Sequence, residues 1–193
     1  MAEPARKLSS TFAEYLAVDE ASELKHEHVH GEIFAMAGGT LEHSRITGNV
    51  ARLLGNQLLG KRCVVFNSDA RVRVRATGLS TYPDVTVVCG SIERDPESAS
   101  TLNNPVVLAE VLSSGTEAYD RGEKFAHYQR ISSLREYVLV SSQGRRIDHY
   151  LRNDDGTWTL RPVEAPETVR LPAIGCELSL DEVYADPFAA PAG

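Results

Sequence analysis

The feature that most constrains the fold of this chain is a continuous apolar run over residues 105–112 that contains one acid, Glu110. A run that is apolar at almost every position indicates a strand that is buried on both faces of a sheet. Because side chains alternate along a strand, Glu110 faces the same way as Leu108 and Leu112. An unpaired carboxylate there is costly, so Glu110 needs a cation partner, a position at the open end of the sheet, or a bound proton.

The composition predicts an ordinary globular protein. The chain has 193 residues, of which 42% are hydrophobic and 24% are charged, and this length suffices for one sizeable core. We expect a single domain over residues 1–193, with its core over about 11–184 and a short loose tail from Pro187. The first ten residues lack the apolar centre of a signal peptide, and no run approaches the roughly 18 apolar residues of a membrane span. We therefore expect a cytoplasmic protein with no membrane partner.

The formal net charge of −7 argues against avid, non-specific binding of nucleic acid, which usually needs a basic surface. It does not exclude transient cleavage, because a metal ion and a local basic stripe can offset catalytic carboxylates.

The three cysteines, Cys63, Cys89 and Cys176, are scattered and include no CxxC pair. This spacing argues against a disulfide framework and against a zinc ribbon. We expect Cys63 and Cys89 to be small buried hydrophobic residues in valine-rich strands.

Hydrophobic periodicity predicts an α/β fold in which helices flank a mixed β-sheet. Helices are expected over residues 11–19, 40–60, 116–130 and 178–184, and a hairpin over 26–37 with its turn at His30-Gly31. Further strands are expected over residues 63–66, 70–76, 84–89, 105–112, 134–141, 145–151 and 158–162, with a polar loop over 90–104.

Two acids and a lysine form the candidate catalytic set. Asp84 opens one strand and Glu110 lies in another, and carboxylate oxygens from neighbouring strands suit Mg²⁺ or Mn²⁺, with the backbone carbonyl of Val111 as a further ligand. Lys124 lies on the predicted helix, where its ammonium can position a water and stabilise a pentavalent transition state. The alternatives are a buried salt bridge from Glu110 to an arginine such as Arg71, turn chemistry at Asp84, and a solvated Lys124.

Three accessory residues are expected near this set. Glu32 shares its strand face with Phe34 and is expected to help a second metal or act as a base. His43 lies near the core-facing edge of its helix and can hold a phosphate or a metal-bound water, although ordinary placement at the edge of the core accounts for it equally well. Tyr128 lies one turn after Lys124 on the same side of the helix.

Two further patterns allow a functional and a structural interpretation. Arg71, Arg73 and Arg75 alternate along one strand, where they can follow a phosphate backbone or solvate a sheet edge. Histidines at positions 26, 28 and 30 also alternate, which suits a transition-metal site but is more typical of a polar outer strand face. A serine hydrolase is disfavoured because no GxSxG elbow is present.

An ordered set of short segments resembles the Uma-two restriction endonuclease family, which belongs to the PD-(D/E)XK nuclease superfamily. These segments are His30-Gly31-Glu32, Ala35-Met36-Ala37-Gly38, His43, Tyr82-Pro83-Asp84-Val85, Glu110-Val111-Leu112-Ser113, Tyr119-Asp120-Arg121-Gly122-Glu123-Lys124, Leu134-Arg135-Glu136-Tyr137 and Leu180-Asp181-Glu182-Val183-Tyr184. Together they cover nearly the whole chain.

The resemblance implies a restriction-endonuclease-like core with C-terminal β-hairpins. It assigns Asp84 and Glu110 as metal-binding acids, Lys124 as the catalytic lysine and Glu32 as the acid near the start of the core. The superfamily usually places its lysine two residues after the acid, where this chain has Leu112. The family is similar to this chain in carrying the lysine on the following helix. A second departure lies over residues 113–116, where family members often carry a proline and a serine.

The expected function is a Mg²⁺- or Mn²⁺-dependent endonuclease that hydrolyses phosphodiester bonds in nucleic acid, with DNA as the expected substrate. The resemblance alone implies a homodimer, because many nucleases of this fold pair to cut both strands. The alternative is a nuclease-fold protein that binds nucleic acid or a partner without cleaving it, which the acidic net charge favours.

Overall fold

The computed structural model describes residues 9–188 and contains a central six-stranded mixed sheet. The strand order of this sheet is β12-β11-β10-β9-β6-β3, and only β9 and β10 pair in parallel. The strands are β3 (Cys63–Asn67), β6 (Val85–Cys89), β9 (Val107–Leu112), β10 (Glu136–Ser141), β11 (Arg146–Arg152) and β12 (Trp158–Glu164). This agrees with the predicted mixed sheet. No helix in the described part of the chain combines the length and the apolar character that crossing a bilayer requires.

Strand β9 forms the centre of the fold, and all six of its residues are buried. Val107, Ala109 and Val111 belong to one hydrophobic core, whereas Leu108 and Leu112 belong to the core on the opposite face of the sheet. The continuous apolar run is thus explained by burial on both faces.

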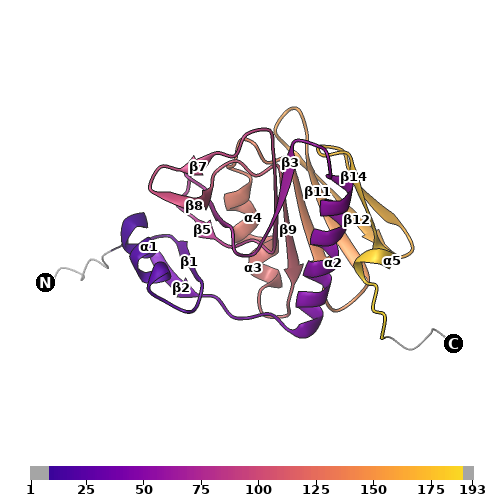
Figure 1. Cartoon of the computed structure of the whole chain (residues 1–193), viewed down its shortest axis with the longest axis horizontal. Coiled ribbons are helices and arrows are strands. Elements are labelled where there is room, and N and C mark those ends of the chain that lie inside the picture. The colour runs from indigo at the N-terminus through magenta and orange to yellow at the C-terminus, as the bar shows by residue number, and fades with distance from the viewer. Residues whose placement is uncertain (1–8, 189–193) are drawn as a thin grey trace, which may run out of the picture.

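The first face of the sheet is covered by α2 (Leu41–Gln57), which lies across it in Figure 1. Thr40 caps this helix, since its side chain accepts a hydrogen bond from the backbone nitrogen of His43. Buried apolar residues at helical spacing pack against the sheet: Ile46, Val50, Leu53 and Leu54. The short helix α5 (Leu180–Val183) and the hairpin of β13 (Thr168–Leu171) and β14 (Cys176–Ser179) complete this layer. The sequence pattern predicted α2 and α5, but not the β13–β14 hairpin.

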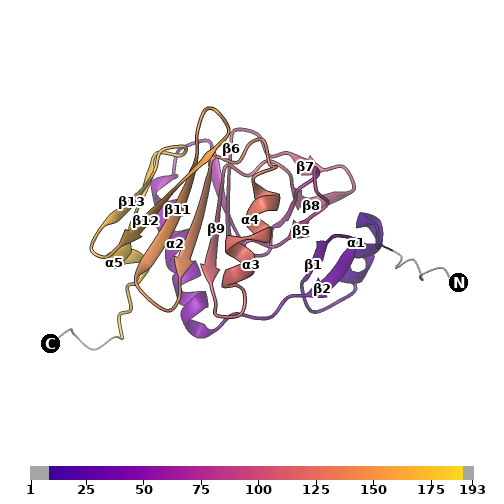
Figure 2. The same ribbon diagram turned by 180° about the vertical axis from the view of Figure 1, so that it is seen from behind.

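The second face is covered by α3 (Glu117–Arg121) and α4 (Glu123–Tyr128), which lie in front of β9 in Figure 2. The single helix predicted over residues 116–130 is therefore wrong, because the chain breaks it at Gly122. The backbone of Gly122 has φ −108° and ψ −95°, and a Cβ there would lie 3.0 Å from the carbonyl oxygen of Ala118. Glycine permits this close approach of the two helices.

A second six-stranded sheet packs beyond α4, with the order β2-β1-β5-β4-β8-β7. Its strands are β1 (His26–Val29), β2 (Glu32–Ala35), β4 (Arg71–Arg73), β5 (Ser80–Thr81), β7 (Arg94–Asp95) and β8 (Ser98–Leu102). Helix α1 (Phe12–Glu20) lies against β1, and Thr11 and Glu14 form its capping box. The polar loop predicted over residues 90–104 is wrong, since β7 and β8 form there.

The predicted hairpin near the start of the chain is present as β1 and β2. His30 and Gly31 form its turn with φ values of 51° and 77°, the left-handed backbone that a two-residue hairpin turn requires. The register places Glu27 opposite Phe34 and Val29 opposite Glu32. These four side chains therefore share one face of the hairpin.

A buried ion pair connects the second sheet to α1. The Arg71 guanidinium and the Asp19 carboxylate are both almost completely buried, and the Tyr82 hydroxyl donates a hydrogen bond to the same carboxylate. Two more bonds from Arg71 reach the side chains of Ser98 and Thr101. Removing one partner of such a network leaves a buried charge uncompensated, so Arg71 has a structural role.

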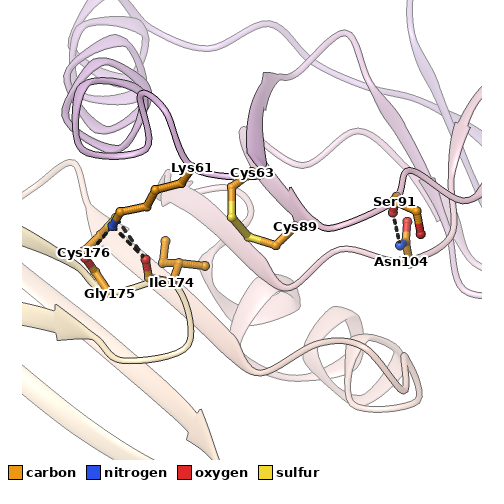
Figure 3. The surroundings of a disulfide bond; sticks show 8 residues. All are labelled: Lys61, Cys63, Cys89, Ser91, Asn104, Ile174, Gly175 and Cys176. Carbon is orange, nitrogen blue, oxygen red and sulfur yellow. Dashed lines mark hydrogen bonds between the residues drawn. A yellow bond between two sulfur atoms is a disulfide. The ribbon is translucent and has the colours of Figure 1, made fainter.

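The structure contradicts the prediction that Cys63 and Cys89 are unpaired hydrophobic residues. They lie opposite each other on the antiparallel pair β3–β6 and form a disulfide (Figure 3). Cys176 is buried and free. Sequence spacing did not reveal the pairing, because the register of two strands that are 26 residues apart decides it.

Because the disulfide closes a 26-residue separation, we expect reduction to destabilise the fold by about 3 kcal/mol. This corresponds to a fall in Tm of roughly 5–10 °C, measured by calorimetry with and without reductant. The Cys63→Ala/Cys89→Ala double variant should not respond to reductant, whereas Cys176→Ala should respond as the native protein does. Three titratable thiols in denatured wild-type protein that had been kept under oxidising conditions without reductant would contradict the pairing.

Candidate active site

Asp84, Glu110 and Lys124 meet near the carboxyl end of β9. The Lys124 Nζ lies 2.8 Å from Glu110 Oε1, and the backbone nitrogen of Asp84 donates to Glu110 Oε2 at 3.2 Å. The backbone nitrogen of Val111 donates to Asp84 Oδ2 at 2.7 Å. Segments that are far apart in the sequence thus bring two carboxylates and one ammonium together.

Strand register explains why the two acids are adjacent. The β6–β9 ladder ends with Val85 opposite Ala109, so the preceding residue, Asp84, comes to lie beside Glu110. Pro83 has no backbone N–H with which to extend the ladder. The pairing therefore stops where the Asp84 side chain turns to the backbone of Val111.

Lys124 is buried rather than solvated, with only 5% of its surface exposed. Besides Glu110, it contacts Asp120 Oδ1 at 3.3 Å. The Tyr128 hydroxyl donates to Glu110 Oε1 at 2.9 Å. The cation beside Glu110 is thus Lys124 and not Arg71, which pairs with Asp19.

The electrostatics of this cluster are dominated by burial. Burial raises the pKa of Glu110 to about 8; the Lys124 charge opposes this shift, and the neighbouring Asp84 and Asp120 carboxylates add to it. Burial by itself would lower the pKa of Lys124, but the carboxylates of Glu110, Asp120 and Glu27 outweigh it and raise the pKa. We conclude that Lys124 stays charged and that the site carries more acid than its one ammonium neutralises.

His43 approaches the cluster from the first turn of α2. Its Nε2 lies 3.1 Å from Asp84 Oδ2. The hydrogen bond to Asp84 raises the pKa of His43, the charge of Glu110 and the backbone of Val111 raise it further, and burial opposes the rise. His43 is therefore part of the cluster rather than only an edge-of-core residue.

The first hairpin contributes Glu27, an acid that the sequence analysis did not select, to the surroundings of Lys124. Tyr119 donates a hydrogen bond to the buried Glu27 carboxylate, and the Glu27 charge acts on Lys124. Glu32 shares the hairpin face with Glu27, and both line a cavity of about 360 Å³ together with Tyr119 and Glu123. The alternation argument identified the face that carries Glu32, and cross-strand register places Glu27 on the same face.

The alternating arginines do not form one exposed basic face. Arg71 is buried, and Arg73 pairs with Asp95 at 3.1 Å and with Glu97 at 2.9 Å. Arg75 is exposed, and it lies beyond the end of β4. The expected exposed face of arginines is therefore wrong, because Arg71 is buried and acids pair with both Arg71 and Arg73.

The three alternating histidines, His26, His28 and His30, contact different partners. The ring of His28 bonds to Ser10 at 3.0 Å, and His26 lies 3.4 Å from the Asp19 carboxylate. His30 lies in the hairpin turn and contacts Glu123 instead. These three side chains consequently do not form one metal site.

The donor set at Asp84 and Glu110 fits a hard divalent cation. Its ligands are carboxylate oxygens, which Mg²⁺ and Mn²⁺ prefer. In a strand the N–H and C=O of one residue point to the same edge, so the carbonyl of Val111 faces the Asp84 side as its nitrogen does. Burial is the main cause of the raised pKa of Glu110, and the charges of Asp84 and Asp120 add to it; a bound cation would favour the ionised carboxylate.

Comparison with known proteins relates this chain to a family. The family model described as "Uma2: Putative restriction endonuclease" matches residues 12–182. The chain is 40% identical over 171 residues to the uncharacterised protein slr1290 of Synechocystis, covering 89% of each chain. It is 35% identical over 150 residues to the uncharacterised protein sll1609 of the same organism, covering 78% of this chain and 85% of that one.

A solved structure has a similar fold. It is described as a "putative nuclease belonging to DUF820" from Anabaena variabilis, and it superposes with a TM-score of 0.70. The match covers 84% of this chain and 91% of that one at 18% identity. The restriction-endonuclease-like fold predicted from the sequence is therefore confirmed.

The raised pKa of Glu110 predicts a pH dependence of stability. A carboxyl group whose folded pKa exceeds its unfolded value stabilises the fold below the unfolded value, and this stabilisation is lost as pH rises through the folded pKa. Between pH 4.5 and about 8, the free energy of unfolding should fall by at most about 1.4 kcal/mol per pH unit through this group. Urea denaturation across this range should give a flatter profile for Glu110→Gln, and an identical profile would contradict the shift.

Proposed function

Because this chain belongs to the Uma2 restriction endonuclease family, we propose that it is a Mg²⁺- or Mn²⁺-dependent endonuclease that hydrolyses phosphodiester bonds in DNA. One observation carries the proposal. The Lys124 ammonium lies 2.8 Å from Glu110, whose other carboxylate oxygen accepts from the backbone of Asp84. Two acids from adjacent strands and a buried lysine are the groups that metal-assisted phosphodiester hydrolysis needs.

In this proposal the ion is held by the carboxylates of Asp84 and Glu110 and the backbone carbonyl of Val111. When bound, the ion supplies Lewis-acid stabilisation of the phosphoryl oxygens and makes a coordinated water more acidic. Glu110 has to lose its proton to act as a ligand, and the raised pKa of Glu110 therefore makes metal affinity increase with pH up to about 8.

Lys124 acts as a hydrogen-bond donor and a positive charge rather than as a base. Its pKa is raised by Glu110, Asp120 and Glu27, against the effect of burial, so the ammonium keeps its proton near neutral pH. A buried charge in a fixed position stabilises developing negative charge on a phosphoryl oxygen more strongly than a solvated one. The same ammonium orients the attacking water.

Surrounding residues position these groups. Tyr128 donates to Glu110, and Asp120 contacts Lys124 from one turn earlier in the sequence. His43 lies 3.1 Å from Asp84, and we assign it to a phosphate oxygen of the substrate. Glu32 lines the cavity beside Glu27, where it assists as a second acid.

A homodimer that cuts both strands, acting in the cytoplasm, completes the proposal. Reducing compartments keep thiols unpaired, so in a reducing cytoplasm the Cys63–Cys89 pair would be present as two thiols.

The second candidate function is a nuclease-fold protein that binds nucleic acid or a partner without cleaving it. The net charge of −7 and the pairing of Arg71 and Arg73 with acids favour the form of this alternative that binds a partner other than nucleic acid. The complete set of two acids and a lysine opposes it.

We expect purified protein to nick supercoiled plasmid with Mn²⁺ and not with a chelator. Asp84→Asn, Glu110→Gln and Lys124→Met should each reduce the rate at least about 100-fold, because each removes a charge from the reacting centre. The matched controls are Asp69→Asn and Lys25→Met, which alter an ion pair at the protein surface and should keep the native rate.

Circular dichroism of each variant separates loss of chemistry from loss of folding. Absence of metal-dependent cleavage of DNA and RNA by the native protein, together with binding that Asp84→Asn leaves unchanged, would favour the non-catalytic alternative.

Replacing His43 tests its assignment to the substrate. His43→Gln should lower the cleavage rate roughly 10–100-fold while Mn²⁺ affinity, measured by calorimetry, stays near native. The neighbouring Ser44→Ala, an exposed position on the same helix turn, should leave both unchanged. Loss of Mn²⁺ affinity in His43→Gln would instead assign His43 to the metal, and an unchanged rate would remove it from the site.

A further inference from the structure

A second cluster of ligand-type side chains includes two residues of α4 next to Lys124 and Tyr128 in the sequence. His30, Glu123 and His127 each bring one ligand atom within 4.8 Å of the others. The Nε2 of His30 lies 2.9 Å from Glu123 Oε1, and the two imidazole rings have centroids 5.3 Å apart. The cluster joins the β1–β2 turn to the first and last turns of α4.

The burial of His127 points to a ligand. The residue is 6% exposed, and its Nδ1 has no hydrogen-bond partner among residues 9–188. Its Nε2 lies 4.0 Å from the Glu123 carboxylate, which is beyond hydrogen-bond distance. A buried polar atom without a partner is costly. A cation between the imidazoles and the carboxylate would be bound by Nε2, the ring nitrogen that lies toward Glu123 without reaching hydrogen-bond distance, and not by Nδ1.

The surroundings allow the ligands to close on an ion. His30 and Glu123 are largely exposed, with side-chain exposures of 67% and 50%, so both can move slightly at low cost. His30 also has a left-handed backbone with φ 51°, which directs the turn toward α4. The exposed side leaves room for water as a further ligand.

We propose that His30, Glu123 and His127 form a site for a transition-metal dication, with Zn²⁺ as the ion of matching chemistry. Two imidazole nitrogens and one carboxylate oxygen, with an open fourth position, are a donor set that zinc uses. Imidazole does not suit Mg²⁺, which prefers oxygen ligands. The site differs in its chemistry from the all-oxygen set at Asp84 and Glu110.

This ion would link the first hairpin to α4 at the edge of the cavity. His30 and Glu123 line that cavity together with Glu27 and Glu32. Adjacent residues of α4 thus serve two sites, because Glu123 contacts His30 whereas Lys124 contacts Glu110. Zn²⁺ would hold the hairpin that carries Glu27 against the helix that carries Lys124.

The test is a titration of tag-free, full-length protein with Zn²⁺ by calorimetry, and with Co²⁺ by visible absorption. Both are made in the Asp84→Asn background, which removes the first acid of the proposed catalytic set. We expect one site, a Co²⁺ spectrum of four-coordinate intensity, and a Tm increase of about 5 °C or more at a hundredfold excess of Zn²⁺ over Kd.

The substitutions His30→Ala, Glu123→Gln and His127→Ala should each weaken Zn²⁺ binding on the order of 100-fold. Two of the three positions are exposed, so loss of binding there cannot be ascribed to unfolding. Glu20→Gln, an exposed helical glutamate, is the matched control and should bind as before.

Zn²⁺ binding that survives all three substitutions, or no binding at micromolar Zn²⁺, would overturn the site. Binding that is present in the native protein but absent in the Asp84→Asn background would assign the ion to the catalytic acids instead. No cleavage is measured in these experiments, so they stand apart from the proposed endonuclease function.

Discussion

The buried contact between Glu110 and Lys124 is the interaction on which the arrangement of this molecule depends. A carboxylate at the centre of a sheet that is apolar on both faces is costly unless a cation meets it. Lys124 does so at 2.8 Å, and its own burial is offset by Asp120 and Glu27. The Lys124–Glu110 contact joins α4 to β9. The contact between His30 and Glu123 joins the first hairpin to α4.

The same contact connects the fold to the proposed chemistry. The sheet places Asp84 beside Glu110 because the β6–β9 ladder ends there, and burial raises the pKa of Glu110 against the opposing charge of Lys124. A site with surplus carboxylate and one fixed ammonium is suited to a divalent cation and a phosphodiester. His30, Glu123 and His127 form a cluster of different donor chemistry, and two of its residues lie on α4 next to Lys124 and Tyr128 in the sequence.

Local sequence patterns predicted the elements whose burial is periodic. Thr40 and the apolar spacing of α2 predicted that helix and its cap, and the apolar run predicted β9 as a central strand. Patterns failed where non-local contacts decide the conformation. Gly122 breaks a helix that periodicity extends through it, and the disulfide depends on the register of β3 and β6. The prediction of an exposed basic strand was also wrong, because Arg71 is buried and pairs with Asp19, which Tyr82 also contacts.

For the site, residue type and local pattern identified the candidate groups, whereas tertiary contacts set which of these groups lie beside one another. Residue type and two-residue alternation are local properties of the sequence. They were enough to select Asp84, Glu110 and Lys124 as candidates and to show that Glu110 is an acid in an apolar strand. That the charge of Glu27 acts on Lys124, and that His43 reaches Asp84, depends on strand register and helix docking. These relations arise only when segments distant in the chain pack together, since no local periodicity encodes which distant side chain a buried charge will meet.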